Sequence, residues 1–189
     1  MSHQYHDIAF TPAVKALQEE LGSRDRYAPA EAEPDRNGLL GPDEAAFITT
    51  RDSFYLATVS ETGWPYMQHR GGPAGFLKVL DQRTIGFADY AGNRQYISTA
   101  NIGGNNKVSL FLMDYPMRAR LKIMGHARII ARSQTAVIEA LAVPGYRARI
   151  ERGILIEIAG FDWNCSQHIT PRFTVAEIEA ITAQAEKPE

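Results

Sequence analysis

The central part of the chain is a succession of short hydrophobic, β-prone runs separated by polar turns. From Phe54 onward, short β-branched and aromatic runs are separated by turns rich in Gly, Asp and Pro. The first two runs flank Glu61-Thr62-Gly63, a three-residue turn that predicts a hairpin. The runs that predict an antiparallel meander are 54–59, 65–69, 76–80, 84–88, 108–113, 120–130 and 154–161.

Helical spacing of hydrophobic residues appears mainly toward the two ends of the chain. Thr11-Pro12, followed by apolar residues at helical spacing and ended by Gly22, predicts a capped helix. Residues 23–41 have no sustained period, so we expect an irregular surface connection there. Further helices are predicted from Pro42, from a Ser133 cap to Pro144-Gly145, and from a Thr174/Glu177 capping box.

Many antiparallel strands with helices at the ends predict a mainly β fold, a small barrel whose openings are covered by helices. The 189 residues suit a single domain able to bury a core. Within it, we expect 1–41 to pack on the barrel and 42–189 to form the barrel with a C-terminal helix.

Composition limits the classes of function. Twenty basic against twenty-two acidic residues give a net charge of -2, which argues against nucleic acid or an anionic membrane as partner. An anion site must therefore be local. The polar start, the lack of a bilayer-length apolar stretch and the single cysteine, Cys165, lead us to expect a cytoplasmic protein without a Cys-rich zinc framework.

Three segments combine basic residues with features that suit phosphate. Residues 86–95 run from a strand through Asp89 into a Gly-Asn turn, which sets Arg94 at a helix start, although a solvated surface Arg is the plainer interpretation. Residues 69–78 are rich in glycine between Arg70 and Lys78, as a strand crossover also would be. Alternation over 118–125 puts Arg120 and Lys122 on one face, as in any solvated barrel strand.

Taken in order, these segments resemble the pyridoxamine 5'-phosphate oxidase-like flavoproteins, which have an FMN-binding split β-barrel of Greek-key-like topology. The resemblance covers roughly 47–130, including Gly63-Trp64-Pro65 and Asn105 before Val108. It implies that Arg70 and Arg94 contact the FMN phosphate, that Asn93 stands where the family has Ser, and that Gln95 replaces its usual Lys. One positive charge is thus missing.

The tail from Phe161 to Arg172 resembles the end of uncharacterised flavin-binding relatives. By this resemblance Trp163 and Arg172 approach the flavin, while simple core packing is an equally good interpretation of Trp163. Cys165 and His168 have a C-x-x-H spacing, but two ligands without others nearby argue against a metal site, and a redox thiol is a similarly remote alternative.

The resemblance implies an FMN-dependent oxidoreductase for an unknown small molecule, and a homodimer with flavin sites at its interface. Vitamin B6 oxidation is not expected, because 143–149 lacks the family's Arg-Pro segment and 170–172 lacks its Arg-x-His. The alternatives are a non-catalytic binder of flavin, deazaflavin or haem, and a scaffold without cofactor. The expected cofactor-binding residues are His69, Arg70, Gly72, Lys78, Asp89, Asn93, Arg94, Gln95, Arg120, Lys122, Trp163 and Arg172.

Overall fold

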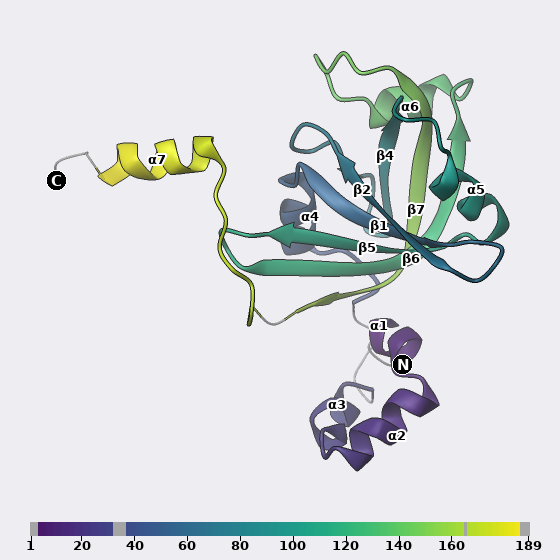
Figure 1. Ribbon diagram of the computed structural model, residues 1–189, viewed down its shortest axis with the longest axis vertical. Coiled ribbons are helices and arrows are strands. Elements are labelled where there is room, and N and C mark those ends of the chain that lie inside the picture. Colours follow the sequence, from purple (N-terminus) through teal and green to yellow (C-terminus); the bar gives the residue numbers. More distant parts are fainter. Residues whose placement is uncertain (1–3, 32–36, 165, 186–189) are drawn as a thin grey trace.

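Seven strands form one antiparallel sheet in the computed structural model, which describes residues 4–31, 37–164 and 166–185. Figure 1 shows the sheet curling around a core, so the predicted mainly β architecture is confirmed. The sheet order is β2-β1-β5-β6-β7-β4-β3. The strands are β1 (Ser53–Val59), β2 (Pro65–Gly71), β3 (Lys78–Val79), β4 (Thr84–Tyr90), β5 (Lys107–Asp114), β6 (Ala119–Ala131) and β7 (Ile150–Trp163).

The core lies inside the curled sheet and is filled by aliphatic residues around three phenylalanines. Phe54 stacks on Phe76 with ring centroids 5.6 Å apart and meets Phe87 edge-on at 5.2 Å. All three rings are almost completely buried: Phe54 comes from β1, Phe87 from β4 and Phe76 from the connection between β2 and β3. A smaller cluster on the other side of the sheet, around Leu155, is covered by α6.

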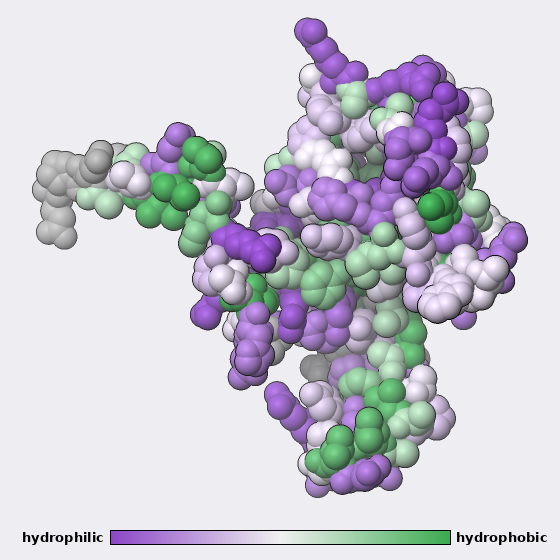
Figure 2. All heavy atoms as spheres, in the orientation of Figure 1, coloured by the Kyte–Doolittle hydropathy of each residue, from purple (hydrophilic) through white to green (hydrophobic). Residues whose placement is uncertain are grey.

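Seven helices surround the sheet among the described residues. Two of them matter for the site: α5 follows the loop after β4, and α6 connects β6 to β7. The C-terminal α7 extends away from the barrel (Figure 1), and Figure 2 shows hydrophobic side chains along it. The helices are α1 (Gln4–Ala9), α2 (Pro12–Glu20), α3 (Arg24–Glu31), α4 (Pro42–Thr49), α5 (Ile97–Gly104), α6 (Thr135–Leu141) and α7 (Val175–Ala185).

Most of the local signals have the predicted effect. The Thr11 hydroxyl accepts a hydrogen bond from Val14 N, Gly63 turns the first hairpin with φ +82°, and Thr174 and Glu177 cap α7 reciprocally. The predicted Ser133 cap is wrong, because α6 begins after Gln134 and shows no side-chain cap. Leu141, the last residue of α6, packs in the hydrophobic cluster on the sheet at the other end of the helix.

The expectation of an irregular connection over 23–41 is wrong for its first part, which forms α3 despite Pro29. Ion pairs at its two ends compensate for the weak helical pattern. Glu31 lies 2.7 Å from Arg24 across α3 and 3.0 Å from Lys15 of α2. The contact with Lys15 joins two different helices, so the residues of 24–31 alone could not indicate it.

The N-terminal segment packs against the free edge and outer face of β7. Asn37 exchanges hydrogen bonds with the backbone of Phe161, at 2.8 and 3.0 Å, where β4 no longer covers the strand. Tyr5 lies over Gly160, where a Cβ atom would come within 2.7 Å of the Tyr5 nitrogen. The described residues include no helix long and apolar enough to cross a membrane.

The ion pairs of Glu31 generate a pH-dependent prediction. Its hydrogen bonds with Arg24 and Lys15 lower the pKa of the Glu31 carboxyl to about 2. A carboxyl with a lowered pKa stabilises the folded state above its unfolded value of about 4.5, and this contribution is lost as the pH falls from there toward 2. A carbon-13 carboxyl titration by NMR should show a midpoint near 2, and an ordinary midpoint would contradict the contacts. Arg24→Gln should raise the pKa of Glu31, because it removes one of the two cations that pair with this carboxylate.

Candidate functional site: a charged pocket at the mouth of the barrel

Three charged residues lie on the inner face of the sheet, between the buried phenylalanines and one open end of the barrel. Arg70 lies opposite Phe54 in the β1–β2 ladder, and Asp89 lies two residues after Phe87 on β4. Arg152 of β7 is the direct partner of Asp89 in the next ladder. Because alternate residues of a strand share a face, these side chains meet at one open end of the barrel.

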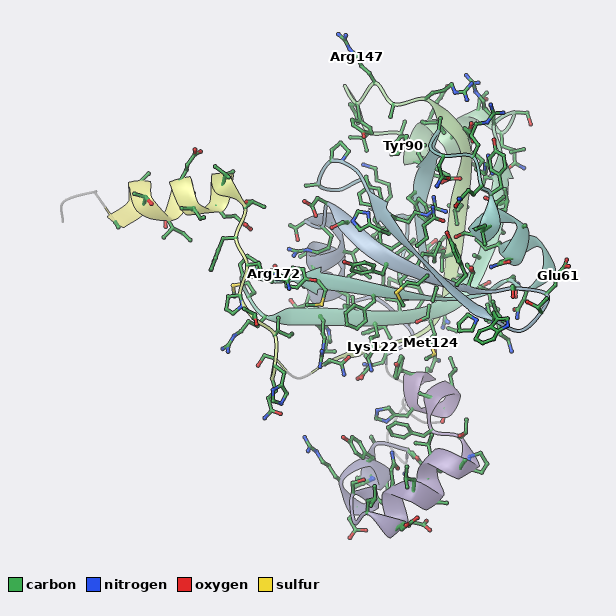
Figure 3. The ribbon with its side chains drawn as sticks, in the orientation of Figure 1. Glu61, Tyr90, Lys122, Met124, Arg147 and Arg172 are labelled. Atoms are coloured by element: carbon green, nitrogen blue, oxygen red, sulfur yellow. The ribbon has the colours of Figure 1, made fainter. Side chains whose placement is uncertain are left out.

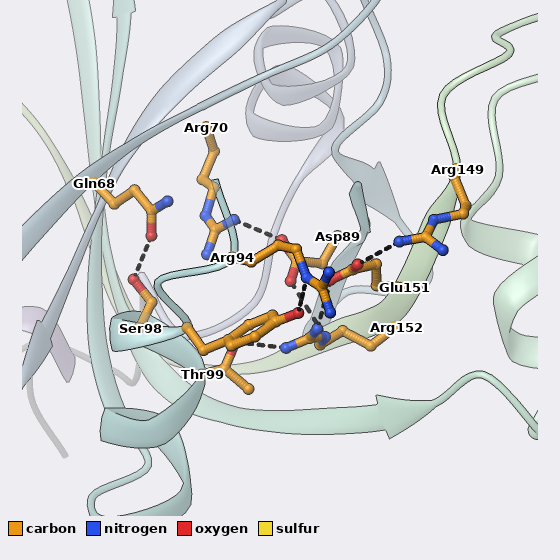
Figure 4. Close-up of polar contacts among 10 residues, drawn as sticks. Gln68, Arg70, Asp89, Arg94, Ser98, Thr99, Arg149, Glu151 and Arg152 are labelled. Carbon is orange, nitrogen blue, oxygen red and sulfur yellow. Dashed lines mark hydrogen bonds and ion pairs between the residues drawn. The ribbon is translucent and has the colours of Figure 1, made fainter. Parts of the chain in front are cut away.

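The carboxylate of Asp89 is the centre of this group. Its Oδ1 accepts a hydrogen bond from Arg70 Nη1 at 2.5 Å, and its Oδ2 lies 3.5 Å from Arg152 Nε. Arg70 also lies 5.7 Å from the ring of Phe87. Figure 4 shows the two guanidinium groups on either side of the carboxylate. The buried charges are therefore paired, as their removal from water requires.

A pocket of about 210 Å³ opens beside this group. Four residues expected from the sequence line it together, namely Arg70, Asp89, Asn93 and Arg94. A smaller hollow of about 150 Å³ adjoins it and includes His69. The residues of the larger pocket that were not expected as site residues are Gln68, Tyr90, Gly92, Tyr96, Ser98, Thr99 and Glu151.

The loop from Asn93 to Tyr96 forms one wall and leads into α5. Asn93 Oδ1 accepts a hydrogen bond from Gln95 N at 3.2 Å, and both Arg94 and Tyr96 adopt the left-handed conformation, with φ of 61° and 55°. Arg94 Nε donates to the Tyr96 hydroxyl at 3.0 Å, which raises the pKa of Arg94 above its usual value. Tyr96 precedes the first turn of α5, so free N–H groups and the positive end of the helix lie at the pocket.

Two buried polar atoms at the pocket walls have no partner among the described residues. They are Nε of Arg70 and the hydroxyl of Tyr90. Burial, together with the neighbouring Tyr146, raises the pKa of Tyr90. An N–H donor and a neutral hydroxyl left unpaired inside a protein are unfavourable, and a polar ligand in the pocket would satisfy both.

Trp163 and Arg172 lie at the opposite end of the barrel from this pocket. Trp163 ends β7, eleven residues from Arg152, a separation of about 36 Å along an extended strand. Its Nε1 donates to Glu44 at 2.7 Å, and Arg172 lies 4.9 Å above the ring of Tyr115. Figure 3 shows Arg172 far from Tyr90. Within one chain these residues do not reach the Arg94 loop.

Arg120 and Lys122 are also distant from the pocket. Lys122 pairs with Asp162 at 3.5 Å and lies 4.7 Å above the ring of Tyr5, and Figure 3 shows it beside α1. Arg120 lies two residues earlier on β6, facing Met113 across the ladder. The face that alternation predicted to be basic is therefore covered at this point by an aromatic ring.

The remaining expected residues make other contacts, and of them His69 lines the smaller hollow at the mouth. Gly72 gives room to Phe76, because a Cβ there would come within 2.8 Å of that ring, so packing accounts for this glycine. Lys78 pairs with Gly86 at the edge of the sheet, and Gln95 is exposed. His69 meets Tyr55 edge-on.

In the part of the chain that the structure describes, no group of three or more His, Cys, Asp or Glu is placed to hold a metal ion. Cys165 lies outside the described residues, so both the metal and the thiol alternatives for Cys165 and His168 remain hypotheses.

The most important residues that the sequence analysis missed are Glu151 and Arg152. Their charged run, Arg149-Ile150-Glu151-Arg152, comes just before the apolar segment that predicted the last strand. In the structure β7 begins at Ile150, so the run belongs to the strand. A charged start to an otherwise apolar strand is the signal that could have found them, but their partners depend on the register with β4.

Comparisons with known proteins agree with this architecture. The model of the family described as pyridoxamine 5'-phosphate oxidase matches residues 40–158. Among solved structures, a putative pyridoxamine 5'-phosphate oxidase from Lactobacillus delbrueckii superposes with a TM-score of 0.51 at 19% identity, covering 66% of this chain and 94% of that one. No curated protein matches the chain significantly.

Two further solved structures have the same fold, with similar TM-scores and similarly low sequence identity. HupZ of Group A Streptococcus gives a TM-score of 0.51 at 14% identity, with 71% of this chain and all of that chain covered. The conserved hypothetical protein Rv2991 of Mycobacterium tuberculosis gives 0.50 at 15% identity, with 76% and 97% covered. The predicted split β-barrel is thereby confirmed.

The paired charges at the mouth lead to a stability prediction. Asp89→Asn leaves Arg70 and Arg152, whose side chains are 14% and 16% exposed, without their shared carboxylate. We expect a loss of about 1 to 3 kcal/mol in the free energy of unfolding, measured by urea denaturation. Glu157→Gln, which removes an exposed carboxylate of β7, is the control and should change it by less than about 0.5 kcal/mol. Equal effects would contradict the central role of Asp89.

Proposed function

Because the chain belongs to the pyridoxamine 5'-phosphate oxidase family, we propose that it binds FMN and acts as an FMN-dependent oxidoreductase on a small molecule. The pocket at the mouth of the barrel is the observation that carries this proposal. It combines the Arg94 loop with the positive end of α5, an arrangement that suits a phosphate monoester.

The unpaired polar atoms of the pocket support the same ligand. Arg70 Nε is buried and can donate one hydrogen bond, while the Tyr90 hydroxyl can donate or accept. The phosphate of FMN offers hydrogen-bond acceptors, and its isoalloxazine ring offers both acceptors and a donor N–H. FMN therefore has suitable partners for the Arg70 N–H and for the Tyr90 hydroxyl.

Each residue has a distinct part in this proposal. Arg94 and the first-turn N–H groups of α5 would hold the phosphate, and Arg70 would remain fixed by Asp89 while offering its free N–H. Bound flavin would supply the electron transfer. The chain's residues bind and orient it, and the ion-paired wall keeps their geometry fixed without the ligand.

The proposal includes a homodimer in which a second chain completes each site. Support comes from the separation of Trp163 and Arg172 from the pocket of their own chain, because the flavin contacts that the resemblance implies for them would then have to be made across an interface. Further support comes from an apolar trough of about 470 Å³ on the outer sheet face, lined by Ala57, Val59 and Met124. An uncovered apolar face of this kind is typical of an interface.

We expect Arg94→Ala to weaken FMN binding about ten- to hundredfold, because it removes one charge-assisted contact to the phosphate. Quenching of flavin fluorescence during titration measures the dissociation constant. Arg147→Ala is a matched control, since Figure 3 shows Arg147 projecting away from the body of the barrel. Unchanged affinity in Arg94→Ala would mean that the phosphate lies elsewhere.

Enzymatic activity is tested on the FMN-loaded protein by anaerobic mixing with NADH or NADPH. Bleaching of the flavin absorption band at a catalytically useful rate would support the oxidoreductase. Stoichiometric FMN that neither donor reduces would favour the alternative of a non-catalytic binder on the same fold.

For the dimer, light scattering across a dilution series should give twice the monomer mass, with FMN extending the dimer to lower concentration. Trp163→Ala and Arg172→Ala should weaken FMN binding although both residues lie far from the pocket of their own chain. Arg83→Ala, which changes an exposed turn at the other end of β4, is the control. A stable monomer that binds FMN stoichiometrically would contradict the interface site.

A further inference from the structure

Gln95 leaves the Arg94 loop one positive charge short of the pattern that the resemblance implies, and the structure offers a replacement from another strand. We infer that Arg152 of β7 is a positioning residue for the phosphate-binding loop: it holds Tyr96, and through Tyr96 it holds Arg94, while adding the second positive charge. This inference rests on the proposed binding of a phosphate at the pocket.

The contacts of Arg152 join the loop to the wall of the barrel. Its guanidinium lies 4.9 Å above the ring of Tyr96, and its Nη1 donates to Thr99 Oγ1 in the first turn of α5 at 3.0 Å. On its other side Nε faces Asp89 at 3.5 Å and Nη2 donates to Glu151 at 2.8 Å. Figure 4 shows Arg152 between these carboxylates and Thr99. One side chain thus connects β4, β7 and α5.

Tyr96 transmits this constraint to Arg94. Its ring packs on Arg152 and its hydroxyl accepts the hydrogen bond from Arg94 Nε, so the same side chain touches both guanidinium groups. Arg94 and Tyr96 both have positive φ, which is unfavourable for residues other than glycine. Such a conformation persists only where its surroundings hold it. Arg152 lies against the ring of Tyr96, and Thr99 in turn accepts a hydrogen bond from Arg152.

The charges around the pocket also favour an anion once Arg152 is included. The pocket is lined by two guanidinium groups, Arg70 and Arg94, and by two carboxylates, Asp89 and Glu151. Arg152, which pairs with both carboxylates, adds one positive charge in excess beside this lining, in a chain whose net charge is -2. A phosphate monoester carries nearly two negative charges at neutral pH.

The geometry requires arginine rather than any cation at this position. Arg152 uses Nε, Nη1 and Nη2 toward three different residues, and its flat face lies on an aromatic ring. A lysine ammonium keeps the charge but has neither the planar fork nor the stacking face. Arg152→Lys should therefore keep part of the function, whereas Arg152→Gln should lose both charge and fork.

The test compares FMN with riboflavin, which lacks the phosphate, by fluorescence titration of the full-length protein. We expect Arg152→Gln to weaken FMN binding about tenfold or more and to change riboflavin binding by less than about twofold, with Arg152→Lys in between. Arg83→Gln removes an equal charge from an exposed turn and should affect neither ligand. Equal losses for both flavins, or no loss for FMN, would overturn the inference.

A second variant covers the case in which Arg152→Gln does not fold. Tyr96 is 41% exposed, so Tyr96→Leu removes the link between the two arginines with little loss of core packing. It should weaken FMN selectively, as Arg152→Gln does. Tyr96→Leu with wild-type FMN affinity would overturn the positioning role, because Tyr96 is the only described side chain shown to contact both guanidinium groups.

Inorganic phosphate separates failure of this inference from failure of the proposed function. If wild-type protein does not bind FMN, thermal unfolding in sodium phosphate is compared with sodium chloride of equal ionic strength. A phosphate-specific rise in unfolding temperature that Arg152→Gln or Tyr96→Leu abolishes would keep the anion site and discard the flavin. The absence of any such rise in the wild type would overturn both.

Discussion

One buried carboxylate facing two guanidinium groups is the interaction on which the candidate site depends. Asp89 on β4 pairs with Arg70 on β2 and with Arg152 on β7, so strands that are not neighbours in sequence are held at one end of the barrel. A buried charge must be compensated, and this requirement orients both arginines. The pocket and the adjoining loop take their geometry from that fixed arrangement.

The strands could be predicted from the sequence because they are short runs rich in β-branched and aromatic residues, and in Arg120-Leu121-Lys122-Ile123 apolar and basic residues also alternate with period two. Signals contained within a few residues, such as Thr11, Gly63 and the Thr174/Glu177 pair, were also sufficient. The predictions that were wrong concern the two helices α3 and α6. The helix over Arg24–Glu31 is joined by an ion pair to Lys15 of another helix, and α6 begins after Gln134 without the cap that Ser133 suggested, so neighbouring residues alone could not indicate either one.

The same distinction applies to the site. Arg70, Asp89, Asn93 and Arg94, which line the pocket together, could be expected from the sequence because they lie in short segments with glycine and charge patterns that also resemble a known family. Arg152 was missed because its role is created by register: only the pairing of β4 with β7 sets it opposite Asp89. Trp163 and Arg172 were expected from the family resemblance, but a resemblance in sequence does not say whether two residues of a site come from the same chain or from different chains.

Gly160 gives the barrel a point of attachment that is independent of its strand pairing. The backbone of Tyr5 lies where a side chain at position 160 would be, while the sheet hydrogen bonds of β7 do not require glycine. A single methyl group at this position would therefore force the backbone of Tyr5 to move, whereas the pairing of β7 with β6 does not depend on the glycine. The close packing of α1 on the barrel thus depends on the absence of one side chain, and a one-residue change is enough to alter it in evolution or in protein engineering.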